Sequence, residues 1–221
     1  PVRIGVIQIP TFYIDFEGRS QGDSDYRSTT RDTRKLIDAL KFSNVDGLVI
    51  DLRGNGGGAL TEAISLSGLF ISSGPIIQIR DARGRIRPRN DPDKGIAYSG
   101  PLAVLVDRES ASASEIFAGA MQDYRRGLII GEPTFGKGTV QNLIDLDRYS
   151  EDDSPVGQLK ITTAQFFRID GNSTQHRGIV PDIVLPMTVD SETQGERGLN
   201  HALPWAKIAA AKFQHFSDAS V

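Results

Sequence analysis

The chain has 221 residues, 38% of them apolar, and a formal net charge of −3 at pH 7. This length and composition suit one sizeable folded domain and exclude a disordered chain. The 25 basic residues form no dense stripe, which argues against a nucleic-acid-binding protein. Because the chain contains no cysteine, disulfides, cysteine-based metal sites and a thiol nucleophile are excluded. No apolar run reaches the length of a membrane span.

The first fifty residues predict a strand, a loop, a helix and a second strand. Val2 to Ile9 alternates in hydropathy and predicts a strand that begins without an initiator Met or a signal peptide, so we interpret the chain as a fragment of a longer protein. Residues 15–30 are polar and predict a loop, whereas 30–42 carry apolar residues at helical spacing. Gly47 to Arg53 is an apolar run typical of a strand buried on both faces.

The middle of the chain repeats a strand–turn–helix pattern, with one hairpin between the repeats. The predicted segments are, in chain order, the strand at 47–53, glycines at 54–58, a helix at 60–70, a hairpin over 76–87, a strand at 102–106, a helix at 112–124 and a strand at 127–130. Strands that alternate with helices favour an α/β fold with a mostly parallel sheet and flanking helices.

The last third of the chain predicts two further strands and a helical end. Residues 139–146 and 159–167 read as strands, and 178–186 are extended and punctuated by proline. Residues 188–200 are polar, and 202–216 show a helical pattern around Trp205. We therefore expect a core at 1–187, followed by a polar linker and a C-terminal helical segment at 188–221.

Three stretches carry candidate chemistry, and the first is the run from Arg108 to Glu115 at the start of a predicted helix. A serine there gains from the positive end of the helix dipole, and free backbone N–H groups of the first turn can bind an oxyanion. Ser112 and Glu115 also spell a capping box, S-x-x-E, so a structural role is the main alternative. Spacing alone does not choose among Ser110, Ser112 and Ser114.

The second stretch, Asp51 to Gly58, places glycines after a buried strand. Glycines there let backbone N–H groups face a ligand without a Cβ in the way, although a tight turn is the simpler alternative.

The third stretch, Gly131 to Thr139, places Lys137 between two glycines and nearly matches a phosphate-binding P-loop. Gly138 replaces the hydroxyl residue that such a loop needs for magnesium, and β-branched residues follow where a helix is required. A solvated loop lysine is the other alternative. The three histidines lack metal-ligand spacing, so the base for a serine nucleophile is expected to be a lysine.

Together these stretches resemble the tail-specific, or C-terminal processing, peptidases. The matching residues are DLRGNGGGALTEA (51–63), SASASEIFAGAMQDY (110–124), GEPTFGKGTVQ (131–141), FFRIDGNSTQHRGIVPDI (166–183) and NHALPW (200–205). The last of these is similar to the bacterial periplasmic branch of the family. The resemblance implies a Clp peptidase/crotonase-like core and a serine endopeptidase with a Ser–Lys catalytic pair.

The same resemblance implies a role for individual residues. Ser112 matches the nucleophile, Lys137 the general base and Gln141 the residue that holds the lysine in place. The residues that match the oxyanion hole are Gly58, with Gly57 adjacent, and the N–H of Ala113. The residues on other motif positions, with supporting roles, are Arg53, Glu115, Asp123 and Thr134. No metal or organic cofactor is implied.

The family also implies partners that lie outside this sequence. Its members carry a PDZ domain that captures the C-terminus of a protein substrate, and the periplasmic branch has flanking helical regions; no stretch of this chain resembles a PDZ domain. Apolar C-terminal tails, a membrane-associated adaptor and a periplasmic location are further expectations. The alternatives from other classes are a catalytically inactive domain and a crotonase-like acyl-CoA-binding domain of the same fold.

Overall fold

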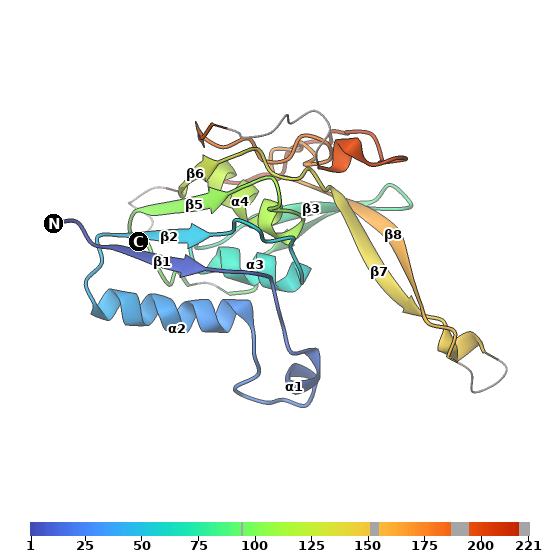
Figure 1. The fold of residues 1–221 in the computed structure, drawn as a ribbon, viewed down its shortest axis with the longest axis horizontal. Coiled ribbons are helices and arrows are strands. Elements are labelled where there is room, and N and C mark those ends of the chain that lie inside the picture. The colour runs from blue at the N-terminus through green and yellow to red at the C-terminus, as the bar shows by residue number, and fades with distance from the viewer. Residues whose placement is uncertain (94, 151–154, 187–194, 217–221) are drawn as a thin grey trace.

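Within residues 1–93, 95–150, 155–186 and 195–216, which the computed structural model describes, five parallel strands form one sheet and four antiparallel strands form a second (Figure 1). The helices are α1 (Phe16–Ser20), α2 (Thr29–Phe42), α3 (Leu60–Gly68), α4 (Ala113–Asp123) and the short 3-10 helices η1 (Asp147–Tyr149) and η2 (Glu196–Gly198). The strands are β1 (Ile4–Gln8), β2 (Gly47–Asp51), β3 (Pro75–Asp81), β4 (Ile86–Asn90), β5 (Leu102–Val106), β6 (Leu128–Gly131), β7 (Thr139–Asp145), β8 (Gln158–Phe167) and β9 (Ile183–Val184). The predicted α/β class with a parallel sheet is confirmed.

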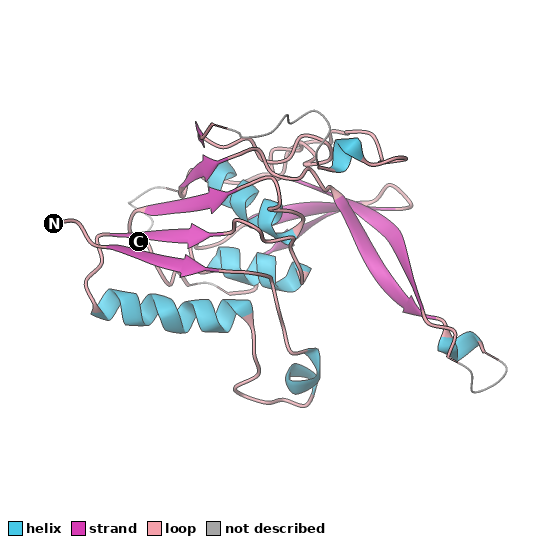
Figure 2. Ribbon diagram, in the orientation of Figure 1, coloured by secondary structure: helices cyan, strands magenta, loops and turns pink. Residues whose placement is uncertain are grey.

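One face of the parallel sheet carries the core. The strands follow the order β1-β2-β5-β6-β9, and Ile7, Ile50, Val104 and Ile129 lie side by side in register. All four side chains are buried, because α2, α3 and α4 pack against this face (Figure 2). This face therefore supplies most of the apolar burial that stabilises the domain.

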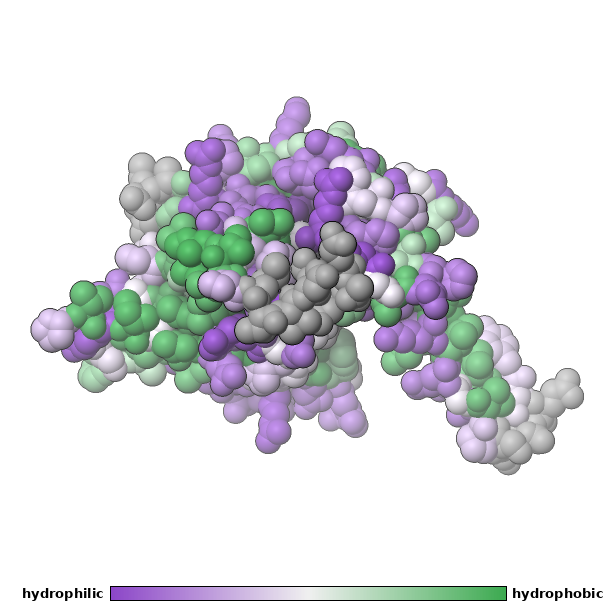
Figure 3. Space-filling view, turned by 45° about the horizontal axis from the view of Figure 1, so that its top comes forward, coloured by the Kyte–Doolittle hydropathy of each residue, from purple (hydrophilic) through white to green (hydrophobic). Residues whose placement is uncertain are grey.

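The opposite face of the same sheet reaches solvent. In the next register row, Val6 is 60% exposed and Leu128 is 53% exposed, while Val49 and Ala103 between them are partly buried. Figure 3 shows apolar side chains gathered over the strands near the N-terminal end. No helix among the described residues covers this face, although parallel sheets are usually buried on both sides.

The second sheet, in the order β4-β3-β8-β7, joins the core to a projecting arm. Gln78 of β3 pairs with Phe167 of β8, so this end of the sheet lies against the core. Strands β7 and β8 then run away from the body as a long hairpin (Figure 1). In this sheet β7 is an edge strand, and its first residues lie at the base of the arm.

Two segments differ from the sequence-based prediction. Within the predicted loop at 15–30, a short helix α1 forms because Asp15 caps it, accepting a hydrogen bond from the Gly18 N–H at 2.9 Å. The helix predicted over 202–216 is wrong, since this segment is extended. Its backbone bonds to residues 169–173 instead, with Ile208 donating to Gly171 and Ala211 donating to Ile169. These tertiary pairings outweigh the local helical pattern.

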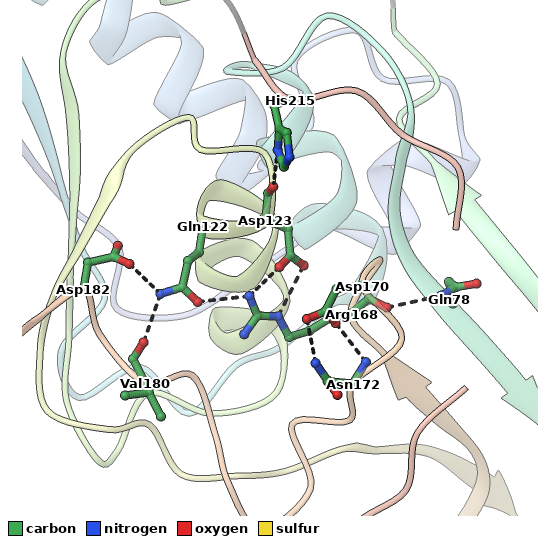
Figure 4. Close-up of polar contacts among 9 residues, drawn as sticks. All are labelled: Gln78, Gln122, Asp123, Arg168, Asp170, Asn172, Val180, Asp182 and His215. Atoms are coloured by element: carbon green, nitrogen blue, oxygen red, sulfur yellow. Dashed lines mark hydrogen bonds and ion pairs between the residues drawn. The ribbon is translucent and has the colours of Figure 1, made fainter. Parts of the chain in front are cut away.

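An ion pair holds the C-terminal end of α4 against the residue that directly follows β8. Asp123 pairs with Arg168, which also donates to the side-chain oxygen of Gln122 at 3.0 Å (Figure 4). The amide nitrogen of Gln122 in turn donates to Asp182 at 2.9 Å. The Asp123 side chain is 5% exposed and that of Arg168 is 18% exposed, so the pair is largely desolvated. The network fixes the helix that carries Ser112 at its other end.

Asp123→Asn should lower the free energy of unfolding by about 2–4 kcal/mol, because it leaves the Arg168 guanidinium buried without its counter-charge. Urea unfolding followed by circular dichroism measures this difference. Asp38→Asn, an exposed change of the same type on α2, is the matched control and should cost less than about 0.5 kcal/mol. Equal stability of the two variants would contradict a structural role for Asp123.

Candidate active site

Three loops leave the carboxyl ends of adjacent strands of the parallel sheet. The loop after β2 carries the glycines, the loop after β5 carries Ser112 and the loop after β6 carries Lys137. Because β2, β5 and β6 are neighbours and run parallel, these loops meet at one edge of the sheet. Ligands of open α/β sheets bind at this edge.

A cleft of about 670 Å³ opens where the three loops meet. The predicted site residues that line it are Gly58, Ser112, Ala113, Lys137 and Gln141. Its apolar lining comes from Phe16, Leu60, Ile116, Val140, Leu143 and Phe166. The edge strand β7 forms one wall, so a chain entering the cleft meets unpaired strand backbone and apolar side chains together.

Burial separates the three serines that spacing could not. The hydroxyl of Ser110 is fully buried and donates to the Leu52 carbonyl at 2.9 Å. The hydroxyl of Ser114 is also fully buried and donates to the Asn55 carbonyl at 2.8 Å. Of the three, within the described residues, Ser112 alone lines the cleft. Ser110 and Ser114 therefore tie the β2 and β5 loops together, while Ser112 is accessible.

The backbone of Ser112 has an unfavourable conformation. Its φ of 57° and ψ of −109° lie outside the regions that residues with a Cβ prefer. Such a geometry costs about 1–3 kcal/mol and persists where surrounding contacts enforce it. Ser112 is the N-cap of α4, so its side chain is presented at the positive end of the helix.

Glu115 is the contact that enforces this geometry. The Ser112 N–H donates to Glu115 Oε2 at 2.7 Å, and the Lys137 N–H donates to the same oxygen at 3.0 Å. Glu115 Oε1 accepts from the Thr134 hydroxyl and from the Gly136 N–H, both at 2.7 Å. All four partners are donors, so only the ionised carboxylate satisfies them. Burial nevertheless raises the pKa of Glu115 to about 7, while these hydrogen bonds act in the opposite direction.

Lys137 is half-buried at the end of this chain of contacts. Burial lowers the pKa of its amine, and the nearby Lys160 ammonium lowers it further. The carboxylates of Glu196 and Glu115 oppose these effects. Among the described residues no hydrogen bond joins the Lys137 amine to Ser112 or to Gln141, although all three line one cleft. Catalytic hydrogen bonds are often long before substrate binds.

The glycine loop and the start of α4 bring backbone N–H groups to the cleft lining. The Gly57 N–H donates to the Asn55 side chain at 2.9 Å, so it is engaged. The N–H groups of Gly58 and Ala113 have no acceptor among the described residues. At Gly57 an added Cβ would lie 2.9 Å from the Ser112 Cβ, which shows how closely the two loops approach. Gly58 and Ala113 therefore place N–H groups without an acceptor among the described residues at the cleft lining.

The remaining motif residues lie outside the cleft lining. The exposed Arg53 makes an ion pair at 2.7 Å with the buried Asp51, and Asp123 lies at the far end of α4. Thr134 acts through Glu115, as described above. Sequence reasoning missed Asn55, which is fully buried and donates to the Ile9 carbonyl at 2.7 Å. An Asn within a glycine turn is a signal that could have indicated this anchoring.

The sequence matches the family described as Peptidase family S41 over residues 3–185. It is 49% identical over 212 residues to the tail-specific protease of Haemophilus influenzae, which covers 96% of this chain and 29% of that protein. It is 34% identical over 194 residues to the chloroplastic carboxyl-terminal-processing peptidase 2 of Arabidopsis thaliana, covering 87% of this chain and 34% of that one. The chain therefore spans about a third of the length of these relatives.

Solved structures of C-terminal processing and related proteases resemble this chain as well. The photosystem II D1 C-terminal processing protease superposes with a TM-score of 0.67 at 33% identity, covering 82% of this chain and 42% of that one. Mature CPAF in complex with lactacystin has a TM-score of 0.63 at 17% identity over 83% of this chain and 47% of that one, a likeness of fold. These neighbours bear out the predicted Clp peptidase/crotonase-like core. With a family match over most of its length and a relative at 49% identity, the chain belongs to peptidase family S41.

Proposed function

We propose that the chain is the catalytic core of a serine endopeptidase in which Ser112 is the nucleophile and Lys137 the general base. The proposal rests on one hydrogen-bond acceptor that both residues share. One oxygen of Glu115 accepts from the backbone N–H of Ser112 and from that of Lys137, and these two residues line one cleft. Two loops distant in sequence are thereby held in a fixed relation, as a nucleophile and its base require.

The chemistry follows from the protonation state of Lys137. The neutral amine removes the proton of the Ser112 hydroxyl as its oxygen attacks a peptide carbonyl. The amine then passes that proton to the leaving nitrogen, and an acyl-enzyme remains. Water then attacks the acyl-enzyme while the Lys137 amine accepts its proton, and the ammonium returns this proton to the Ser112 oxygen as the bond from that oxygen to the acyl carbon breaks. Burial of the lysine supports this role, since a fully solvated amine would stay charged at neutral pH.

Two further features suit peptide hydrolysis. The N–H groups of Gly58 and Ala113 would hold the oxyanion of the tetrahedral intermediate, each contributing roughly 3–4 kcal/mol to its stability. The exposed edge of β7 would pair with an extended peptide, because residues 139–143 line the cleft. Gln141 lies on this strand and would steady Lys137 in the complex.

The activity of the longer protein is also a proposal. By analogy with the Haemophilus tail-specific protease and its bacterial relatives, the substrates would be proteins recognised through apolar C-terminal tails. Delivery of these tails would rely on a PDZ domain, helical regions and a membrane-associated adaptor outside this sequence, and the location would be the periplasm. Among the described residues, no helix is long and apolar enough to cross a membrane.

Ser112→Ala should abolish cleavage of an unfolded protein with an apolar C-terminus, because it removes the proposed attacking oxygen. Ser110→Ala and Ser114→Ala should retain most of the activity per folded molecule, since their hydroxyls bond to backbone carbonyls. Product formation by gel and mass spectrometry measures this. Equal loss in all three variants, or survival of activity in Ser112→Ala, would refute the assignment.

The rate should rise with pH as Lys137 loses its proton, with a midpoint below the pKa of an exposed lysine. Acid suppresses activity because only the neutral amine accepts the serine proton, and protonation of Glu115 acts in the same direction. Lys137→Arg should be inactive at every pH, since a guanidinium stays charged. The measurement is kcat/KM against pH. An active Lys137→Arg variant with a flat profile would contradict the mechanism.

Glu115→Gln should lower both stability and kcat, because the amide nitrogen would face two N–H or O–H donors. The expected loss of stability is about 1–3 kcal/mol. Glu62→Gln on α3 is the matched control: Glu62 is also buried, yet its two side-chain bonds, from Ser28 and Thr30, go to one oxygen that an amide can supply. Unfolding by urea and turnover of a peptide are compared. Similar behaviour of the two variants would show that the four-donor arrangement is unimportant.

A further inference from the structure

The loop that carries Lys137 is supported on a second side, opposite Glu115. The Gly138 N–H donates to the side-chain oxygen of Gln175 at 2.8 Å. The Thr174 hydroxyl donates to the Lys137 carbonyl at 2.9 Å, and the His176 N–H donates to the Gly136 carbonyl at 2.8 Å. Residues 136–138 are therefore bonded along their whole length to residues 174–176, which leaves the lysine backbone little freedom.

Gln175 is itself held by Glu196. Because the Gln175 oxygen accepts from Gly138, its amide nitrogen points the other way and donates to Glu196 Oε1 at 3.2 Å. The Glu196 N–H donates to the Phe135 carbonyl at 2.9 Å. Gln175 is fully buried and Glu196 is 9% exposed, so both polar side chains are removed from water. The contacts form a closed circuit from Phe135 through Lys137 and back.

Glu196 begins the 3-10 helix η2 in the C-terminal segment, beyond the residues that the family model matches, 3–185. This segment is anchored to the core downstream of Glu196. The Trp205 indole donates to the Ser173 carbonyl at 3.0 Å, and the Ser173 N–H donates to the Ala206 carbonyl at 3.1 Å. The segment that contains residue 196 is therefore held in place by its hydrogen bonds to residues 169–173, next to the lysine loop.

We propose that Glu196 is a positioning residue for Lys137, holding the lysine loop through the amide of Gln175. The inference rests on the proposed role of Lys137 as the base. Three charged groups act on the amine: Lys160 from β8, Glu115 from α4 and Glu196 from η2. Glu196 opposes the effect of burial, so it keeps the amine from losing its proton too readily while the circuit fixes where the amine lies.

Glu196→Gln separates charge from shape in the full chain. The amide oxygen can still accept from Gln175, whereas the negative charge is gone. The probe is the Cε resonance of Lys137, assigned with Lys137→Arg and titrated by NMR in a Ser112→Ala background, so that no turnover is needed. The pKa of Lys137 should fall in Glu196→Gln and stay unchanged in Asp38→Asn, an exposed carboxylate replaced on α2. An unchanged pKa of Lys137 in folded Glu196→Gln would overturn the proposed effect of the Glu196 charge on the amine, and the Glu196→Ala variant tests the positioning.

Glu196→Ala tests the support itself, with a second measurement. Peptide turnover should show kcat reduced by up to about 100-fold with KM nearly unchanged, because the base is displaced and the peptide-binding wall is not. In Glu196→Gln the acid limb of the rate profile should move to lower pH, which a structural role would not cause. A kcat in Glu196→Ala equal to that of Asp38→Asn would overturn the proposal. Absence of Ser112-dependent turnover in the unmodified chain would instead count against the proposed function, and the NMR titration would still decide the role of Glu196.

Discussion

A single buried carboxylate organises the cleft. Glu115 is fully buried and accepts four hydrogen bonds, two at each of its oxygens, so neither oxygen is free to serve another role. Hydrogen bonds to a charged group are worth about 1.5–3 kcal/mol each, which offsets the cost of removing the carboxylate from water. Because the donors come from the helix start at Ser112 and from the loop at 134–137, the relative position of these two segments depends on this one side chain.

The sheet topology explains why such a contact can form. Parallel strands deliver their carboxyl ends to one edge, and β2, β5 and β6 are neighbours there although the chain between them includes the β3–β4 hairpin. The antiparallel sheet then adds the edge strand β7 directly after Lys137. The same short stretch, 137–139, thus links Lys137, the proposed base, to the wall along which a peptide would bind.

The sequence predicted the strands and helices of the core well, since their apolar patterns are local. It also predicted the capping pair of Ser112 and Glu115. It could not show that the Glu115 carboxylate also accepts hydrogen bonds from the loop at 134–137, because that contact depends on the order of the strands in the sheet. Spacing did not choose among the three serines and only the resemblance selected Ser112, because periodicity within one turn does not encode the burial that separates Ser112 from Ser110 and Ser114. Residues 202–216 misled for the opposite reason: their helical pattern is real, but the backbone finds partners in residues 169–173.

The conformation of Ser112 has an evolutionary consequence. Glycine has no Cβ and adopts a φ of 57° without steric cost, so replacing Ser112 by glycine would relieve about 1–3 kcal/mol of strain. The greater freedom of glycine in the unfolded chain would offset about 0.5–1 kcal/mol of this gain. The substitution would also remove the proposed nucleophile. In a lineage released from selection for turnover, drift toward a more stable protein and loss of the proposed catalysis would follow the same path.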